Sequence, residues 1–175
     1  MHIIKHFRTI TRHRHMVLKY CFKCGLYKQG LLHDLSKYGF KEFFTGAKYY
    51  LGVKSPHTNE RAKKGYSEAW MHHYGRNKHH SEYWYDYNIE HNCYMPVEMP
   101  NKYIFEMFCD RLAASKNYNL KNYNPSIPLE YFLNEQDRII MHEKTKEKIL
   151  FLLNLYVEKG EKEVFRFIKK NKKTF

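Results

Sequence analysis

Residues 103–116, YIFEMFCDRLAASK, show the clearest hydrophobic periodicity in the chain. Apolar side chains recur there every three or four residues, which places them on one face of an α-helix: Ile104, Met107, Phe108 and Leu112. No convincing set of alternating apolar and polar segments accompanies this pattern, so strands are not expected. The sequence therefore predicts an all-α fold, a compact helical bundle.

The chain is expected to form one domain over residues 1–175. Its length allows a single substantial core, and 43% hydrophobic residues with only 5 prolines and 8 glycines indicate a folded globule. We expect the core to cover about residues 11–158. A short basic helix, about residues 161–170, should follow Gly160.

Further helices are predicted from apolar spacing and from capping residues. The first covers residues 11–23 with Thr11 as cap, and the second starts near Gln29 and carries LLHDLSK. The others cover KEFFTGAKYYL, SEAWMHH (which opens at Ser67), KHHSEYWYDYNI, and about residues 135–158. Gly75 predicts a turn in YGRN. SPHTNERAKKGY, CYMPVEMPNKY and NYNPSIP have the composition of loops.

The formal net charge of +13 favours polyanionic or phosphorylated partners, although a simple solvated basic surface explains it equally well. Cys21 and Cys24 have CxxC spacing without a second pair, so we interpret them as small buried residues with reduced thiols. No apolar segment approaches the roughly 20 residues that span a bilayer, and the basic N-terminus lacks the apolar run of a signal peptide. A soluble, cytoplasmic protein is expected.

LLHDLSK places His33 and Asp34 directly after an apolar run. Burying these groups costs several kcal/mol unless a hydrogen bond, a salt bridge or a metal ion compensates them. Asp110 interrupts the apolar face of residues 103–116 in the same way, and it could instead pair with Arg111 or Lys116.

The 12 histidines are clustered rather than scattered. His15 begins the apolar part of the first predicted helix, whereas His2, His6 and His13 are assigned to a basic surface. Two pairs flank the YGRN turn: His72 with His73, and His79 with His80. On a continuous helix His73 and His80 would lie about 10.5 Å apart, at 1.5 Å per residue, so the turn at Gly75 is needed to bring them together. Imidazole and carboxylate donors together suit divalent ions such as zinc, iron and manganese.

These motifs resemble the HD-domain superfamily of metal-dependent phosphohydrolases. LLHDLSK matches its apolar–His–Asp–apolar–small–Lys motif, with Ser36 where glycine is commoner, and CDRLA resembles the motif around its last aspartate. Over about residues 11–170 the chain also resembles a small, uncharacterised family of bacterial and phage proteins that contain HDLSK, AWxHHxGRNKHH and EMxCDRxAASK. The interval between His15 and His33 is short for the superfamily.

The resemblance implies an HD-like bundle with one or two divalent ions per chain, Fe, Mn, Zn, Ni or Co. The first ligands would be His15, His33, Asp34 and Asp110. His72 and His80 would be the additional ligands of two-metal members, with His73 and His79 as the alternatives within each pair.

The expected reaction is hydrolysis of a nucleotide or another phosphorylated small molecule, because a bound divalent ion generates hydroxide as a nucleophile near neutral pH. Asp34, Lys37 and Glu82 are the catalytic candidates, with Glu82 as proton shuttle or orienting group. The candidates for phosphate contacts are Lys37, Arg76, Lys78, Arg111 and Lys116. The aromatic residues of SEYWYDY could form core or stack on a base.

Other functions remain open at this point. The same ligands would serve a di-iron oxygenase of the HD type. The charge and the basic ends, FRTITRHRH and FIKKNKKTF, would serve a non-enzymatic nucleic-acid-binding protein. An HNH-type nuclease is disfavoured because no β-hairpin is expected beside HHYGRNKHH. The sequence does not indicate an oligomeric state.

Overall fold

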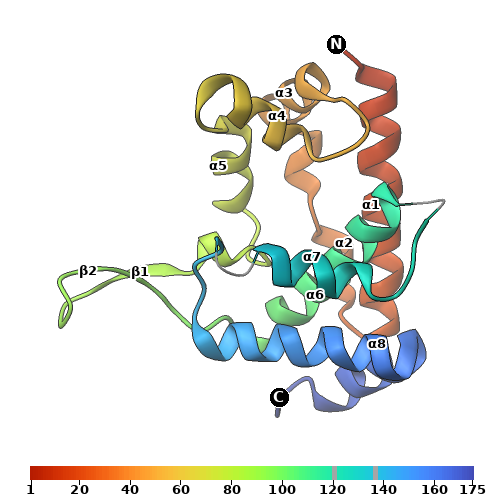
Figure 1. The fold of residues 1–175 in the computed structure, drawn as a ribbon, viewed down its shortest axis with the longest axis vertical. Helices are drawn as coiled ribbons and strands as arrows, with labels where there is room; N and C mark the ends of the chain where they lie inside the picture. Colours follow the sequence, from red (N-terminus) through yellow and green to blue (C-terminus); the bar gives the residue numbers. More distant parts are fainter. Residues whose placement is uncertain (120–121, 136–137) are drawn as a thin grey trace.

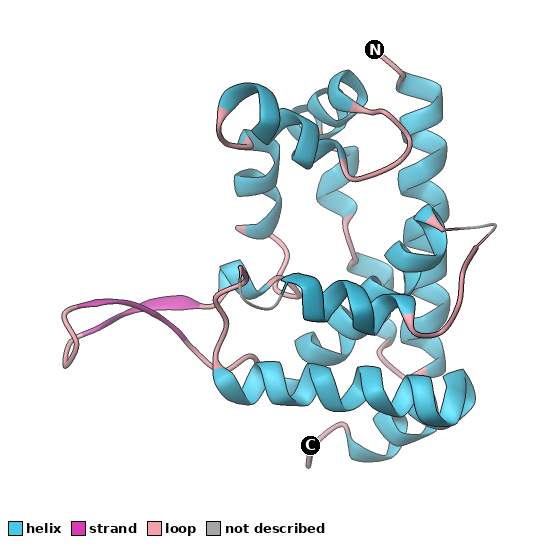
Figure 2. Cartoon of the chain, viewed as in Figure 1, coloured by secondary structure: helices cyan, strands magenta, loops and turns pink. Residues whose placement is uncertain are grey.

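The computed structural model describes residues 1–119, 122–135 and 138–175. Most of this part of the chain is helical, and the prediction of an all-α fold is confirmed (Figures 1 and 2). The α-helices are α1 (Ile3–Lys23), α2 (Tyr27–Leu32), α3 (Phe40–Tyr49), α4 (Pro56–Lys64), α5 (Glu68–Tyr74), α6 (Asn101–Tyr118), α7 (Ile127–Glu135) and α8 (Glu143–Asn171). Two short 3₁₀ helices, η1 (Leu35–Tyr38) and η2 (Ser81–Tyr83), complete the helical part.

The hydrophobic core lies where α1, α6 and α8 meet. In Figure 1, α1 runs along one side of the molecule, and α8 crosses below α6 and α7. Each of the three helices contributes fully buried side chains, among them Val17, Phe108, Leu112, Leu152 and Leu153. Complete burial stabilises the fold by about 1.5–3 kcal/mol for each such apolar side chain. The periodicity of residues 103–116 therefore corresponds to the helix at the centre of the bundle.

Several helix boundaries differ from the prediction. Helix α1 begins at Ile3 rather than at Thr11, because a buried face that includes His6 and Ile10 continues toward the N-terminus and packs on α3. SPHTNERAKKGY is largely a helix, α4, rather than a loop. Its breakers are caps: Pro56 occupies the first turn, and Gly65, with φ 82°, ends the helix in the left-handed conformation.

The C-terminal helix also differs from the prediction. Helix α8 starts at Glu143, so residues 138–142 are not part of it, and residues 136 and 137 of the predicted helix lie outside the described residues. The break predicted at Gly160 is present as a kink with φ 79° and ψ 176° inside α8.

A β-hairpin replaces the helix predicted through KHHSEYWYDYNI. Strand β1 (Tyr85–Asn88) pairs antiparallel with β2 (Cys93–Pro96), so that Tyr85 lies opposite Pro96. The hairpin projects from the helical body on the side away from α1 (Figure 2). Only η2 remains of the predicted helix, because a segment rich in tyrosine favours an extended backbone. Among the helices that the structure describes, none has the length and apolar character needed to cross a bilayer.

Candidate metal centre

The segment LLHDLSK is a tight turn between two helices, and the predicted continuous helix is wrong. Helix α2 ends at Leu32, His33 has an extended ψ of 127°, and Asp34 has the left-handed conformation with φ 53°. Arg14 donates hydrogen bonds to the carbonyls of His33 and Leu31, which the end of α2 leaves without helical partners. The left-handed conformation costs about 1–2 kcal/mol for a residue with a Cβ. In this turn the neighbouring His33 and Asp34 side chains converge, with Nε2 of His33 3.3 Å from Oδ2 of Asp34.

The first group of converging donors comprises His13, His33, Asp34 and Asp110, whose ligand atoms all lie within 4.8 Å of one another. Helix α1 contributes His13 and α6 contributes Asp110. Nε2 of His13 lies 2.9 Å from Oδ1 of Asp110, and Nε2 of His33 lies 3.6 Å from the same oxygen. Two imidazoles and two carboxylates thus surround one point.

The second group comprises Asp34, His73, His79 and His80 within the same distance limit. Oδ1 of Asp34 lies 3.2 Å from Nε2 of His73 and 3.5 Å from Nε2 of His79. The two Nε2 atoms of His73 and His80 are 3.0 Å apart, because α5 ends at Tyr74 with Gly75 as its C-cap and the chain turns back. Asp34 belongs to both groups and presents Oδ2 to the first and Oδ1 to the second. Asp34 could therefore offer one oxygen to an ion in each group.

Four buried polar atoms at this point have no hydrogen-bond partner among the described residues: Nε2 of His13, of His33 and of His79, and Oδ1 of Asp34. Each such atom costs about 1–3 kcal/mol if nothing satisfies it. The ring nitrogen of His13 is close to Asp110 but lacks the alignment of a hydrogen bond, so both atoms are directed at a third position. Divalent cations would satisfy all four atoms, and the donor set fits such ions.

Two further carboxylates contact the histidine rings at Nδ1, the ring nitrogen on the side away from the cluster. Oε1 of Glu106 lies 3.0 Å from Nδ1 of His33 and 3.2 Å from Nδ1 of His79. Oε2 of Glu42 lies 2.8 Å from Nδ1 of His73. A carboxylate beside Nδ1 favours the tautomer that donates from Nδ1 and leaves the Nε2 lone pair free to bind a metal. Sequence reasoning missed both glutamates, although Glu106 lies one helical turn before Asp110 inside an apolar face.

The electrostatics ionise the carboxylates but do not keep every imidazole neutral. Burial opposes the charged form of His33 and of His73, but the charge of Asp34 outweighs it and raises the pKa of both, so a bound ion would displace a proton from each. Burial opposes ionisation of Asp34, but the charges of His33 and Lys37 outweigh it and hold the pKa of this carboxyl well below its ordinary value. Burial also opposes ionisation of Asp110, but the close contacts of its carboxylate with the imidazoles of His13 and His33 outweigh burial and hold its pKa well below the usual range. Burial, followed by the neighbouring charge of His79, keeps the pKa of His80 well below its ordinary value. The carboxylates are therefore charged, and His80 is neutral.

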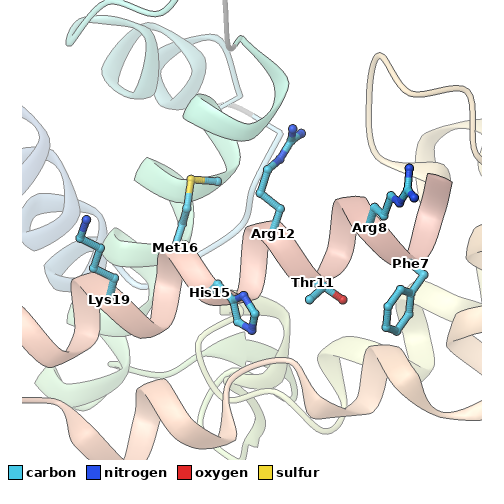
Figure 3. A pocket seen from close by; sticks show the side chains of 7 residues that line it. All are labelled: Phe7, Arg8, Thr11, Arg12, His15, Met16 and Lys19. Atoms are coloured by element: carbon cyan, nitrogen blue, oxygen red, sulfur yellow. The ribbon is translucent and has the colours of Figure 1, made fainter. Parts of the chain in front are cut away.

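His13 occupies the position that was predicted for His15. His15 is exposed and lines a groove along the outer face of α1 (Figure 3). Side chains two residues apart on a helix point about 160° apart, so only one of His13 and His15 can face the core. The buried stripe of α1 includes Ile10, His13 and Val17 at helical spacing, and this pattern could have identified His13.

Of the four histidines predicted around the YGRN turn, three belong to the second group and one belongs to neither. His72 is half-buried and its Nδ1 contacts Glu42 at 2.6 Å, outside both groups, whereas its neighbour His73 belongs to the second. His79 and His80 both belong to the second group, so this histidine pair could supply two ligands.

Of the predicted phosphate-binding cations, Lys37 has the direct contact with the cluster, through Oδ2 of Asp34. Lys116 instead pairs with Glu161 at 2.7 Å, and Arg111 packs over the ring of Phe132. Arg76 donates to the carbonyl of His72, and Lys78 lies over the ring of Tyr83.

The predicted proton shuttle, Glu82, accepts a hydrogen bond from Ser81. Two aromatic residues of SEYWYDY have different environments: Trp84 packs against the core, and Tyr87 is exposed on the hairpin.

The hairpin bears on the argument against an HNH-type nuclease, which assumed that no β-hairpin lies beside HHYGRNKHH. Strand β1 begins five residues after His80, so the expectation that no hairpin accompanies HHYGRNKHH is wrong. In the described part of the chain, however, the members of both groups lie on α1, α5, α6 and the turns after α2 and α5, and none lies on β1 or β2.

Comparison with known proteins identifies one family. The profile of DUF5662, a family of unknown function, matches residues 2–155. The chain belongs to this family. No curated protein and no solved structure matches the DUF5662 chain. The resemblance to the HD-domain superfamily therefore stays a prediction, and the geometry of the two groups carries the functional argument.

Proposed function

We propose that this DUF5662 protein is a metal-dependent phosphohydrolase with a two-metal centre of the HD type. The observation that carries the proposal is the convergence around Asp34, the carboxylate shared by both groups, of buried donor atoms that have no hydrogen-bond partner in the described part of the chain. A buried cluster of this kind costs free energy unless a ligand satisfies its donor atoms, which argues for a bound ion.

The two groups would hold the ions with different donor sets. His13, His33, Asp34 and Asp110 offer two imidazoles and two carboxylates, and the second group offers three imidazoles with the shared Asp34. Mixed nitrogen and oxygen donors suit Fe, Mn, Zn, Ni or Co. When bound, such ions lower the pKa of a water molecule and polarise a phosphoryl oxygen.

Side chains beside the cluster favour an anionic substrate. Lys37 is in contact with Asp34, and 24% of its side chain remains exposed, so its ammonium can reach a substrate oxygen. Phosphoryl transfer asks little of protein side chains beyond positioning and charge compensation. The net charge of +13 would also attract a nucleotide or a phosphoester.

The test is phosphate release by purified protein supplied with manganese, iron, cobalt or nickel, over a panel of nucleotides and phosphomonoesters. Asp34→Asn should abolish turnover and lower the metal content, whereas Glu158→Gln, on the exposed face of α8, should change neither. Elemental analysis of the purified protein gives the identity and number of the ions. Activity that persists in the metal-free protein would overturn the proposal.

A di-iron oxygenase is the second candidate, favoured by the three imidazoles of the second group. Iron with histidine and carboxylate ligands also serves oxygen chemistry. Oxygen consumption by the iron-loaded protein, together with a mixed-valent iron signal, would select this candidate over hydrolysis.

The outer face of α1 favours a third candidate, a nucleic-acid-binding protein. A groove of about 490 Å³ runs along this helix, and Arg8, Arg12 and Lys19 line it beside His15 (Figure 3). Binding of nucleic acid there should weaken steeply with salt and survive chelation of metals. Removal of the metal separates this function from both enzymatic candidates.

A further inference from the structure

We infer that Glu106 is a positioning residue for both metal subsites at once, whereas Glu42 positions a ligand of the second subsite alone. The inference rests on the proposed metal centre. It assigns a function to two buried glutamates that the proposed ligand set does not use.

Glu106 is placed between one histidine of each subsite. Its Oε1 lies 3.0 Å from Nδ1 of His33, which belongs to the first group, and 3.2 Å from Nδ1 of His79, which belongs to the second. The two imidazole rings have centroids 4.4 Å apart. A single oxygen is therefore hydrogen-bonded to Nδ1 of His33 and in contact with Nδ1 of His79, and the Nε2 atoms of both rings face the cluster without a hydrogen-bond partner among the described residues.

The helix α6 makes this arrangement rigid. Glu106 and Asp110 are four residues apart, so they lie on one face of the helix with the ligand one turn beyond the positioning residue. The residues between and around them, including Phe105 and Cys109, are fully buried in the core. Glu106 itself is 5% exposed, so water does not compete for its carboxylate.

Glu42 provides the contrast on the other side of the cluster. Its two oxygens contact Nδ1 of His73 and Nδ1 of His72, and Ser36 donates to it as well. Of the two histidines, His73 belongs to the second group and His72 to neither. A change at Glu42 should therefore leave the first subsite intact.

The experiment measures Co²⁺ binding to the purified full chain, because the visible absorption of Co²⁺ reports its coordination. Free Co²⁺ is buffered about tenfold above the weaker dissociation constant of the wild-type chain, which should then hold two ions. Loss of an outer carboxylate commonly weakens metal binding about 10–100-fold. Glu42→Gln should keep one ion and the absorption of the first subsite. Titration with Co²⁺ gives the dissociation constant of each subsite: Glu106→Gln should raise both about 10–100-fold, whereas Glu42→Gln should raise that of the second subsite alone.

Folding is checked by the far-ultraviolet circular dichroism of each metal-free variant. If Glu106→Gln loses helicity, Glu106→Asp replaces it, because it keeps the charge but withdraws the oxygen from both rings, and the same weakening of both subsites is expected. Two single-subsite backgrounds complete the design. His13→Ala with Asp110→Ala leaves the second subsite, and His73→Ala with His80→Ala leaves the first. Glu106→Gln should weaken Co²⁺ binding in both backgrounds.

The possible outcomes distinguish a failure of the positioning role of Glu106 from a failure of the proposed metal centre. A wild-type chain that binds no Co²⁺, Mn²⁺, Fe²⁺, Zn²⁺ or Ni²⁺ overturns the metal centre itself. A wild-type chain with two ions, whose Glu106→Gln variant binds both with unchanged dissociation constants, overturns only the role of Glu106. Three ions in the wild type and two in that variant would make Glu106 a direct ligand with His33 and His79, which also overturns the positioning role.

Discussion

The ammonium nitrogen of Lys37 lies 2.5 Å from Oδ2 of Asp34, the carboxylate that both metal groups share. Lys37 is three residues after Asp34, and the left-handed turn at Asp34 followed by η1 brings the two side chains together. Burial opposes the charge on Lys37, but Asp34 and Asp110 raise its pKa above the ordinary value. Lys37 is therefore a permanent cation at the edge of the cluster.

Lys37→Met should separate metal binding from turnover. The variant keeps every proposed ligand, so two ions should remain, but phosphate release should fall about 10²-fold because a charged contact to the reacting phosphate is lost. Elemental analysis and steady-state kinetics provide the two measurements. Lys159→Met, exposed on α8, is the matched control. Unchanged kinetics in Lys37→Met would remove Lys37 from the reaction.

His13→Ala and His15→Ala form a matched pair that tests the first metal subsite. His13 is buried beside Asp110, and His15 is exposed two residues later on the same helix. Truncating His13 removes one of four ligands, so we expect the metal content to drop from two ions toward one. His15→Ala should keep both ions. The opposite result would place the ligand on the outer face of α1 and contradict the structure.

Removal of metal should destabilise the protein. Ions that bind only the native state add about 2.7 kcal/mol of stability at a ligand concentration 100 times the dissociation constant. Thermal unfolding should therefore move to lower temperature in EDTA and recover when manganese or cobalt is restored. Asp34→Asn serves as the control. Its left-handed backbone tolerates asparagine, and its unfolding temperature should respond little to metal. An equal response in both proteins would show that the ions bind elsewhere.

Glu161 links α8 to α1 and α6, and its contribution to stability should depend on pH. Lys116 and Lys23 each lie 2.7 Å from its carboxylate. Partial burial raises the pKa of Glu161, but hydrogen bonds from these lysines outweigh that effect and lower it. A lowered pKa in the folded state stabilises the protein above the ordinary pKa of glutamic acid, and this stabilisation is lost as the pH falls through the lowered value.

We expect Glu161→Gln to lower the free energy of unfolding by about 1 kcal/mol at pH 7, a small value because these side chains are partly exposed. Denaturant unfolding at pH 7 and near pH 3 measures the difference, which should shrink at the lower pH. Glu163→Gln, which removes an exposed pair with Arg166, should have a smaller effect at both values. A difference that grows on acidification would contradict the assignment.

Local patterns predicted much of the molecule. The apolar spacing of residues 103–116 predicted α6, Ser67 predicted the start of α5 by capping it, and Gly75 predicted the turn that brings His73 to His80. His33, Asp34 and Asp110 were identified as cluster residues because each is a polar group in an apolar run. In each case the signal lies within one or two helical turns of sequence.

Other features depended on contacts between distant segments. His13 rather than His15 faces the cluster because packing of α1 on α3 and α6 extends the buried face of the helix toward its N-terminus. The chain leaves the helix at His33 because Arg14, on another helix, supports the exposed carbonyls. Glu106 and Glu42 acquire their functions from histidines that lie 27 to 73 residues away in sequence. The sequence by itself determined the all-α class, the central helix α6 and the types of donor, since these depend on local spacing and chemistry. Only the tertiary structure decided which donors meet, because that depends on how separate helices pack.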